Sequence, residues 1–390
     1  MKKIVYIFDG ALHHCNSVRD ILYNILCQFD KYNYEQIVVR HHGILRRPLK
    51  TERIMGYKTY STVSCSIKQL LANSNLSIYQ KVSYLIEDAF FIIAIKFSYT
   101  RHIYSAWAYN RFYNKIFKLE KPDIVVYFAY SPQKGFSKIC KKSGIPHISV
   151  LYDTIVGRPN ISQLEIAIET EEIPNTVGYF VPDFFVNDYT KYYNYSNIYS
   201  YKLPLLIPKN DVIKAYTDIE TTYKFTYFGQ MQTFRNGNII KEIFKALGEG
   251  LDVFTSENHE SDDIYVFHNP VSHEQLYKIV ASSDFLVAFD NAEPYAHYLP
   301  SKAYLYVSFT KPIIVFGNNE DSALKQFLDS YPLCYYHNYD DKDLNGLIEF
   351  INTHKNTSGF DEELYSKYTE HLPQEALVDM VSVIKNAIDY

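Results

Sequence analysis

Two short stretches in the second half of the chain place anion-binding residue types where an expected strand ends and an expected helix begins. The first is YFGQMQTFRNG, in which Gly229 follows the strand and Arg235 comes six residues later. A glycine at such a turn lets backbone N–H groups approach a phosphate, and an arginine guanidinium can bind the same oxygens. The second is LPSKAYLYV, where Ser301 and Lys302 open a helix. Together the stretches predict a diphosphate site. Taken alone, each is also explained by a turn glycine with a solvated arginine, or by a serine N-cap with a surface lysine.

A third group of reactive residue types follows expected strands in the first half of the chain. The loop after the first strand is DGALHHC, in which Gly10 allows close approach of a substrate. His13 or His14 can hydrogen-bond that substrate, and a histidine with a pKa near ~6.5 can also transfer a proton. Asp153, which ends ISVLYD, is expected at the same edge of the sheet. We predict catalytic roles for His13, His14 and Asp153. Solvated histidines and an aspartate that caps a turn are the alternatives.

Several other kinds of site are not supported by the sequence. No GxGxxG follows any expected strand and no GxxxxGK[ST] occurs, which argues against dinucleotide redox cofactors and against a P-loop. The five cysteines form no CxxC pair, so neither a disulfide framework nor a structural zinc site is predicted. The stretches SDD at residues 261–263 and DD at residues 340–341 resemble a metal-binding DxD only loosely, and they lie in expected loops with no apolar strand before them. We therefore predict no metal, no cofactor and no nucleic-acid partner.

The elements that must position these residues alternate between strand and helix along the chain. Strand-like runs cover residues 2–10, 34–40, 122–129, 146–153, 179–188, 198–208, 223–229, 251–256, 264–270, 284–290 and 311–317, and helical patterns cover residues 17–29, 77–119, 132–144, 237–250, 272–283, 301 onward and 373–390. Such an alternation predicts α/β architecture, with parallel sheets covered by helices. Because 390 residues exceed one ordinary domain, we expect two Rossmann-like domains facing a cleft, at residues 1–205 and 206–372. Residues 373–390 are expected to form a helix that packs back on the first domain.

The charge is uneven along the chain. Residues 31–121 contain fifteen Lys or Arg and five Asp or Glu, although the whole chain contains 39 and 44. A surface resting on anionic lipid would explain this basic segment, and a solvated helix face explains it equally well. The apolar run at residues 89–95 is far too short to span a bilayer, which needs roughly 20 residues. We expect a cytoplasmic protein. The basic segment suggests that it also contacts the inner face of the membrane as a peripheral protein.

The order of motifs in the second half resembles the donor-binding half of GT-B glycosyltransferases, especially the retaining enzymes of family 4. The resemblance covers residues 222–318, through YFGQMQTFRN, then IYVFHNPVSHEQLYKIVASSDFLVAFDN, then LPSKAYLYVSFTKPIIVFG. It implies transfer of a sugar from a nucleotide diphosphate sugar to a glycan or lipid-linked acceptor, in surface polysaccharide assembly, without metal. The donor-binding residues are then expected to be Gly229, Gln230, Arg235, His268, Glu293, Ser301 and Lys302, and Gly10 is assigned to the acceptor.

One position departs from the family pattern. Members of the family carry a glutamate three residues after the lysine of the Pro-Ser-Lys helix, where it accepts hydrogen bonds from the ribose, and this chain has Leu305. Either another group, such as Glu293, takes this role, or the nucleotide is held differently. Two alternatives therefore stay open: a sugar-nucleotide 2-epimerase, which has the same two-domain architecture, and a non-catalytic protein that binds sugar nucleotides.

Overall fold

The computed structural model divides the chain into two compact units. Unit 1 consists of Met1–Leu203 with Ala376–Tyr390, and unit 2 consists of Pro204–Glu375. The residues that the structure describes are 2–8, 25–27, 29–40, 49–54, 56–62, 77–79, 81–82, 85, 110–129, 135–151, 163–201, 207–217, 222–231, 237–291, 299–319, 321–355, 357, 359–370 and 372–389. Both units are parallel-sheet α/β structures, as the strand and helix alternation predicts.

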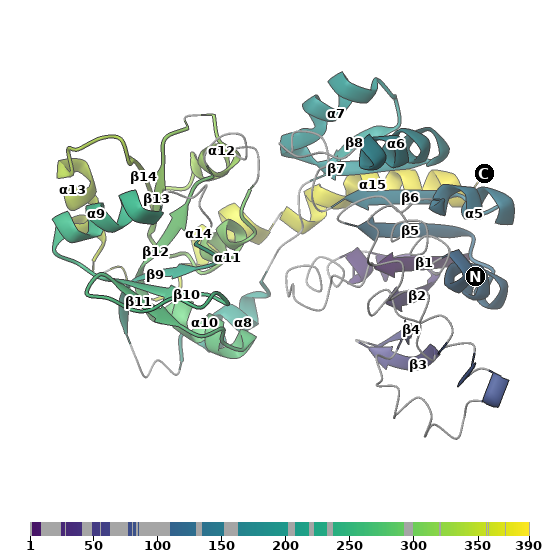
Figure 1. Cartoon of the computed structure of the whole chain (residues 1–390), viewed down its shortest axis with the longest axis horizontal. Helices are drawn as coiled ribbons and strands as arrows, with labels where there is room; N and C mark the ends of the chain where they lie inside the picture. The colour runs from purple at the N-terminus through teal and green to yellow at the C-terminus, as the bar shows by residue number, and fades with distance from the viewer. Residues whose placement is uncertain are drawn as a thin grey trace. The chain divides into compact units, whose positions relative to one another are not determined.

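Unit 1 contains an eight-stranded sheet in the order β3-β4-β2-β1-β5-β6-β7-β8 (Figure 1). The strands are β1 (Lys2–Phe8), β2 (Tyr34–Arg40), β3 (Leu49–Ile54), β4 (Tyr57–Thr62), β5 (Ile124–Ala129), β6 (His147–Leu151), β7 (Gly178–Pro182) and β8 (Ile198–Tyr201). Every pairing is parallel except that of β3 with β4. In β1, Ile4 to Phe8 are completely buried, which explains why this run is apolar without alternation.

The β3–β4 hairpin at one edge of this sheet was not expected from the sequence. Ile54 pairs with Tyr57, so the two strands are joined by a two-residue connection that ends at Gly56. Gly56 has a φ of 88°, a conformation that glycine adopts without steric cost.

The helices of unit 1 lie against both the sheet and one another. They are α5 (Phe136–Ser143), α6 (Gln163–Glu172), α7 (Val186–Tyr193) and most of α15 (Leu372–Asp389), and residues 110–120 are helical as well. Residues 179–188, expected as one strand, instead form β7, a 3-10 turn at Asp183–Phe185 and the start of α7. The hydroxyl of Tyr189, on α7, reaches the buried carboxylate of Glu169 at 2.8 Å, a contact that sequence periodicity does not reveal.

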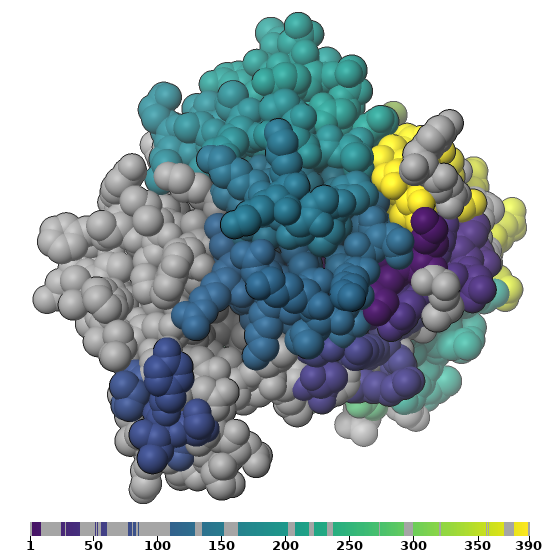
Figure 2. Space-filling view, turned by 90° about the vertical axis from the view of Figure 1, so that its right-hand side faces the viewer, coloured from purple at the N-terminus to yellow at the C-terminus, as the bar shows by residue number. Residues whose placement is uncertain are grey.

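The C-terminal helix α15 packs on unit 1, as predicted. Lys2 Nζ donates to the carbonyl oxygen of Ile388 at 2.9 Å, and Lys385 Nζ lies 3.8 Å from the ring centroid of Tyr32. A side-chain carbon at Gly178 would lie 3.0 Å from Val383 Cγ1, so β7 and α15 are in close contact. Figure 2 shows the yellow end of the chain beside the purple first strands.

Unit 2 contains a six-stranded, fully parallel sheet in the order β11-β10-β9-β12-β13-β14. The strands are β9 (Tyr223–Phe228), β10 (Leu251–Phe254), β11 (Tyr265–His268), β12 (Ser283–Phe289), β13 (Ile313–Gly317) and β14 (Cys334–Asn338). The helices are α8 (Lys209–Ala215), α9 (Gly237–Leu247), α10 (His273–Ser282), α11 (Lys302–Ser308), α12 (Ala323–Leu328), α13 (Asn345–His354) and α14 (Glu362–Tyr365), followed by a π-helical segment at Ser366–Glu370.

Two apolar cores lie on opposite faces of this sheet. One core joins the strands to α8, α10, α11, α12 and α14, and the other joins them to α9 and α13 (Figure 1). The alternation along β12 explains the division, since Leu286 and Ala288 belong to the first core and Val287 and Phe289 to the second. Because all strands of unit 2 are parallel, their carboxyl ends lie on the same side of the sheet, where the functional residues were expected.

Candidate functional site

Gly229 follows β9 and lies directly beside the side chain of Lys302. Its φ is 150°, and its N–H donates to the carbonyl oxygen of Phe254 at 2.9 Å. A side-chain carbon at this position would lie 2.5 Å from Lys302 Nζ and 2.7 Å from Tyr227 Oη. Glycine therefore lets the ammonium group lie close to the turn after β9, and residues with a side chain rarely adopt this φ. The structure brings together these two residues, which are 73 positions apart, as the diphosphate prediction requires.

Two stacked aromatic rings lie next to Lys302 and the turn at Gly229. Lys302 Nζ lies 5.9 Å from the ring centroid of Tyr227, at a distance that allows a cation–π interaction. Tyr227 in turn stacks on Phe289 of the neighbouring strand, with centroids 4.1 Å apart and planes within 9°. The Tyr227 hydroxyl donates to the carbonyl oxygen of Gln230 at 3.0 Å. Gln230 thus lies in the turn after β9, where its carbonyl oxygen is held by Tyr227, and its donor-binding role stays a prediction.

Ser301 and Leu305 show how α11 is oriented. Ser301 occupies the N-cap position and is exposed, but its side chain makes no capping hydrogen bond. Leu305 is 9 % exposed and packs in the core with Ala303 and Tyr306. Leu305, at the position where the resemblance predicts a ribose-binding glutamate, therefore faces the core, and the first turn of α11 contains no acidic residue.

His268 is the last residue of β11, the outer strand of the sheet. Its Nε2 is 2.7 Å from Asp252 Oδ1, and its ring stacks on Phe254 with centroids 4.4 Å apart. Tyr223 meets the same ring edge-on at 6.2 Å. Within the described part of the chain, none of these contacts joins His268 to Gly229 or Lys302. Its donor-binding role stays a prediction.

The remaining predicted site residues lie outside the residues that the structure describes. They are Gly10, His13, His14, Asp153, Arg235 and Glu293.

Glu257 and Asp290 were not predicted, although both lie at the carboxyl edge of this sheet. Glu257 Oε2 accepts the N–H of Met231 at 2.7 Å and lies 3.0 Å from His259 Nε2, so it ties the loop after β10 to the turn after β9. Asp290 directly follows β12 and is 2 % exposed. The only indication in the sequence was an acidic residue just after an apolar strand, which is too common a pattern to single out Asp290.

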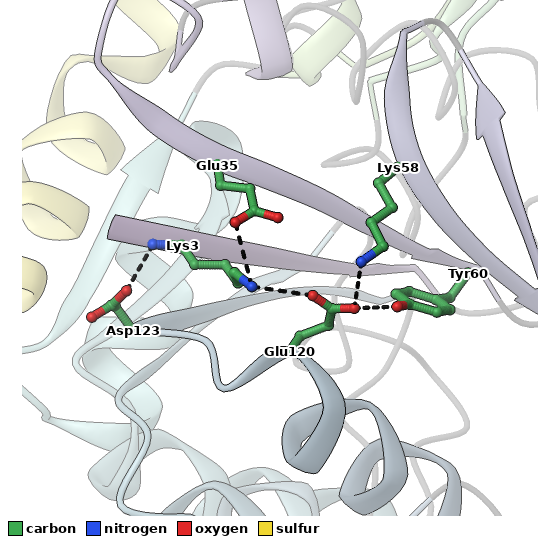
Figure 3. Close-up of polar contacts among 6 residues, drawn as sticks. All are labelled: Lys3, Glu35, Lys58, Tyr60, Glu120 and Asp123. Carbon is green, nitrogen blue, oxygen red and sulfur yellow. Dashed lines mark hydrogen bonds and ion pairs between the residues drawn. The ribbon is translucent and has the colours of Figure 1, made fainter. Parts of the chain in front are cut away.

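A separate charged cluster lies at the amino ends of the strands of unit 1 (Figure 3). The carboxylate of Glu120 accepts hydrogen bonds from Lys3 Nζ at 3.2 Å, from Lys58 Nζ at 2.8 Å and from the Tyr60 hydroxyl. Lys3 also pairs with Glu35 at 3.3 Å, and its N–H donates to Asp123 at 2.7 Å. Ligands of open parallel sheets bind at the carboxyl ends of the strands, so this cluster belongs to the fold and not to the candidate site.

Neither a metal centre nor a membrane span is found in the described part of the chain. No group of three or more His, Cys, Asp or Glu among these residues is arranged to hold a metal ion. No helix among them combines the length and the apolar character needed to cross a bilayer.

Comparison with known proteins shows the fold. No family model matches the chain, and no curated protein matches it in sequence. A sucrose-phosphate synthase from Thermosynechococcus elongatus is similar over 99 % of both chains, with a TM-score of 0.61 and 9 % identity. A UDP-forming trehalose-phosphate synthase from Burkholderia xenovorans, in complex with glucose-6-phosphate, is similar over 100 % of both, also with a TM-score of 0.61 and 9 % identity. A UDP-GlcNAc 2-epimerase from Neisseria meningitidis, bound to UDP-GlcNAc, reaches 0.51 at 9 % identity over 98 % of this chain and 100 % of its own. The chain therefore has the two-domain GT-B fold, and at such identities the likeness shows the fold alone.

Proposed function

We propose that the protein is a glycosyltransferase that moves a sugar from a nucleoside diphosphate sugar to a glycan or lipid-linked acceptor in surface polysaccharide assembly. The observation that carries the proposal is the contact between Gly229 and Lys302 at the carboxyl edge of the unit 2 sheet. A lysine ammonium beside a glycine turn combines a fixed positive charge with accessible backbone donors, which is what a diphosphate requires.

The chemistry that these residues support is stabilisation of the leaving group. When the bond between the sugar and the diphosphate breaks, negative charge grows on the diphosphate oxygen. Lys302, together with Arg235 as a second proposed ligand, lowers the free energy of that charge, and this kind of electrostatic term is usually large in such reactions. The family resemblance favours retention of the anomeric configuration and a reaction without metal. Gly10, His13, His14 and Asp153 are our candidates for the acceptor side.

Calorimetric titration with UDP tests the diphosphate site. Lys302→Ala should weaken UDP binding about tenfold or more, because a charge-assisted contact contributes roughly 1.5–3 kcal/mol. Lys245→Ala is the matched control: Lys245 lies on α9, is 68 % exposed and pairs only loosely with Glu242 at 3.9 Å. Equal UDP affinity in the wild type and in Lys302→Ala would contradict the assignment, provided that both proteins unfold at the same temperature.

The same fold also supports a second reaction, epimerisation at C2 of the sugar. The similarity to the UDP-GlcNAc 2-epimerase favours this alternative, although its TM-score of 0.51 is below the 0.61 of the two synthases. Incubation with a panel of labelled UDP-sugars separates the readings. Transfer or hydrolysis supports the glycosyltransferase, a new epimer supports the epimerase, and binding without turnover supports a non-catalytic sugar-nucleotide-binding protein.

Two further parts of the proposal have their own tests. Transfer should continue in EDTA, and restoration of lost activity by Mg²⁺ or Mn²⁺ would overturn metal independence.

The basic segment, residues 31–121, would place the enzyme on an anionic membrane surface, since each basic residue near such a surface contributes about 1 kcal/mol. Sedimentation with anionic vesicles at low salt and release at high salt would support this, and equal binding to neutral vesicles would contradict it.

A further inference from the structure

Asp290 directly follows β12, the strand next to β9, which leads to the candidate diphosphate site. β12 pairs with β9 so that Val287 is opposite Tyr227. Phe289, the residue before Asp290, stacks on Tyr227, and the Tyr227 ring centroid lies 5.9 Å from Lys302 Nζ, so the end of β12 adjoins the candidate diphosphate site. By alternation with Leu286 and Ala288, the side chain of Asp290 belongs to the face that α11 covers.

The Asp290 carboxylate is surrounded by neutral hydrogen-bond donors. Oδ1 accepts the N–H of Asn291 at 2.9 Å, and Oδ2 accepts the hydroxyl of Tyr336 at 3.0 Å. The hydroxyl of Ser322, which is completely buried, also hydrogen-bonds this carboxylate. The Tyr336 hydroxyl also lies 3.1 Å from the carbonyl oxygen of Asn319, so its single proton has two possible acceptors. The N–H of Asn291 and the hydroxyl of Ser322 fit the ionised carboxylate better than the protonated acid.

Through Tyr336 the carboxylate fixes the turn between β13 and α12. The Tyr336 hydroxyl oxygen accepts the N–H of Asn319 at 3.1 Å, and Ser322 caps α12 by accepting the N–H of Lys325 at 3.0 Å. Gly317 leaves space for this arrangement: a side-chain carbon there would lie 2.7 Å from Asp290 Cβ and would collide with the Tyr336 hydroxyl. We call Asp290, Tyr336, Asn319 and Ser322 the Asp290 clamp.

Charged groups near the clamp are few in the described part of the chain. Lys325 Nζ lies 4.9 Å from the ring centroid of Tyr336, and the N–H of Asp321 donates to Asn319 Oδ1. α11 contributes Lys302, and β13 contains no titratable residue. Burial raises the pKa of Asp290 to about 6, although the hydrogen bonds from Ser322, Tyr336 and Asn291 oppose the rise. Below that pH the Asp290 carboxyl is protonated, so one of its oxygens becomes a donor and can no longer accept all of these hydrogen bonds.

We propose that Asp290 is a positioning residue of the nucleotide-sugar site, which acts by holding the β13–α12 turn against the end of β12 beside Gly229 and Lys302. This inference rests on the proposed function. It implies that the affinity for a nucleotide sugar depends on the ionisation of Asp290, with the tighter site at the higher pH.

The test is calorimetric binding of UDP-GlcNAc and UDP-glucose between pH 5 and pH 7.5. The diphosphate of these probes is esterified at both ends, so it carries no phosphate group that titrates in this range. The wild type should bind at least about fivefold more weakly at pH 5 than at pH 7, which is at the low end of typical coupling between two sites. Asp290→Asn should bind more weakly than the wild type at pH 7 and show little dependence on pH. In Tyr336→Phe the midpoint of the pH dependence should lie above that of the wild type, because the carboxylate loses a donor.

The sign of the effect distinguishes the clamp from histidine titration. Added positive charge near the site would strengthen anion binding at low pH, whereas the clamp predicts weaker binding there. Wild-type affinity that is constant or rises towards pH 5 would overturn the inference, as would the same pH dependence in Asp290→Asn. Absence of binding to the wild type at every pH would instead contradict the proposed function, on which this role depends.

Discussion

Glu120 in unit 1 and Asp290 in unit 2 are both buried carboxylates, but their surroundings differ in charge. Glu120 is 5 % exposed and accepts hydrogen bonds from two lysines, Lys3 and Lys58 (Figure 3). Asp290 is 2 % exposed, and its hydrogen-bond donors among the described residues are neutral groups. Burial alone would raise the pKa of either group. The hydrogen bonds of Lys58, Tyr60 and Lys3 reverse this for Glu120, so its pKa lies below the usual range, whereas the pKa of Asp290 is raised to about 6.

These opposite pKa shifts mean that ionisation of Glu120 stabilises the folded chain, whereas ionisation of Asp290 destabilises it near neutral pH. The ionised form of Glu120 is favoured in the folded chain, and the cluster lies at the amino ends of strands, away from the edge where ligands bind. The ionised form of Asp290 is disfavoured by folding, yet it lies at the edge with Gly229 and Lys302. A group kept ionisable at a cost in stability is more often part of a functional site than of a structural one.

The largest effect is expected from Glu120→Gln. The substitution removes the negative charge that two partly buried lysines share, so the free energy of unfolding at pH 7 should fall by about 3–4 kcal/mol. Urea unfolding followed by circular dichroism measures this. Glu35→Gln is the control, since Glu35 is 37 % exposed and pairs with Lys3 at 3.3 Å, and exposed pairs contribute about 0–1 kcal/mol. Equal losses in the two variants would remove the distinction on which the comparison rests.

The second effect is a pH dependence of opposite sign at the two carboxylates. The folded pKa of Glu120 is depressed, so its stabilising contribution is present above its ordinary value of about 4.5 and is lost as the pH falls. The folded pKa of Asp290 is raised from 3.8 to about 6, so the folded state binds the proton more tightly and stability is lost as the pH rises between these values.

The stability of the wild type relative to Asp290→Asn should therefore decrease by about 2–3 kcal/mol from pH 4 to pH 7. Over the acid range, the stability of the wild type relative to Glu120→Gln should instead increase with pH. Unfolding in urea at a series of pH values gives both curves. If the two differences change in the same direction, the surroundings of the two carboxylates do not control their ionisation as described.

The smallest effect is expected from Tyr60→Phe. This variant removes one of the hydrogen bonds to Glu120 while both lysines remain, so the free energy of unfolding should fall by about 1 kcal/mol. The loss should shrink in acid, where Glu120 becomes protonated in the variant first. A loss as large as that of Glu120→Gln would show that the phenol, and not the lysines, stabilises the carboxylate.

Much of the fold was predictable because central parallel strands are continuous apolar runs. The runs at β1, β9, β12 and β13 were all recognised, as was the packing of the C-terminal helix on unit 1. The hairpin of β3 and β4 was missed, although its two-residue connection ending in Gly56 is a recognisable turn pattern. β14 was missed because its sequence, CYYHN, carries polar atoms that hide its alternation: Tyr335 and Tyr336 belong to opposite faces of the sheet.

The candidate site was predictable only where chemistry and local structure coincide. Gly229 and Lys302 each follow a local pattern of strand, turn and helix, so both could be recognised before their contact was known. Asp290 and Tyr336 are 46 positions apart, and Glu120 and Lys58 are 62 apart. Nothing in local spacing connects such pairs, because the sheet order that brings them together depends on packing over the whole unit. The neutral or charged character of a carboxylate's partners therefore could not be predicted.

The position of α15 has a consequence for how the chain is made. Residues 376–390 complete unit 1, but the ribosome synthesises them after all of unit 2. The hydrogen bond from Lys2 to Ile388 joins positions 386 residues apart, so it cannot form until α15 has been translated. Unit 2 is continuous and can fold during synthesis, whereas the surface of unit 1 around Gly178 waits uncovered for its helix. Unit 1 is therefore expected to reach its full set of contacts only after α15 has been made.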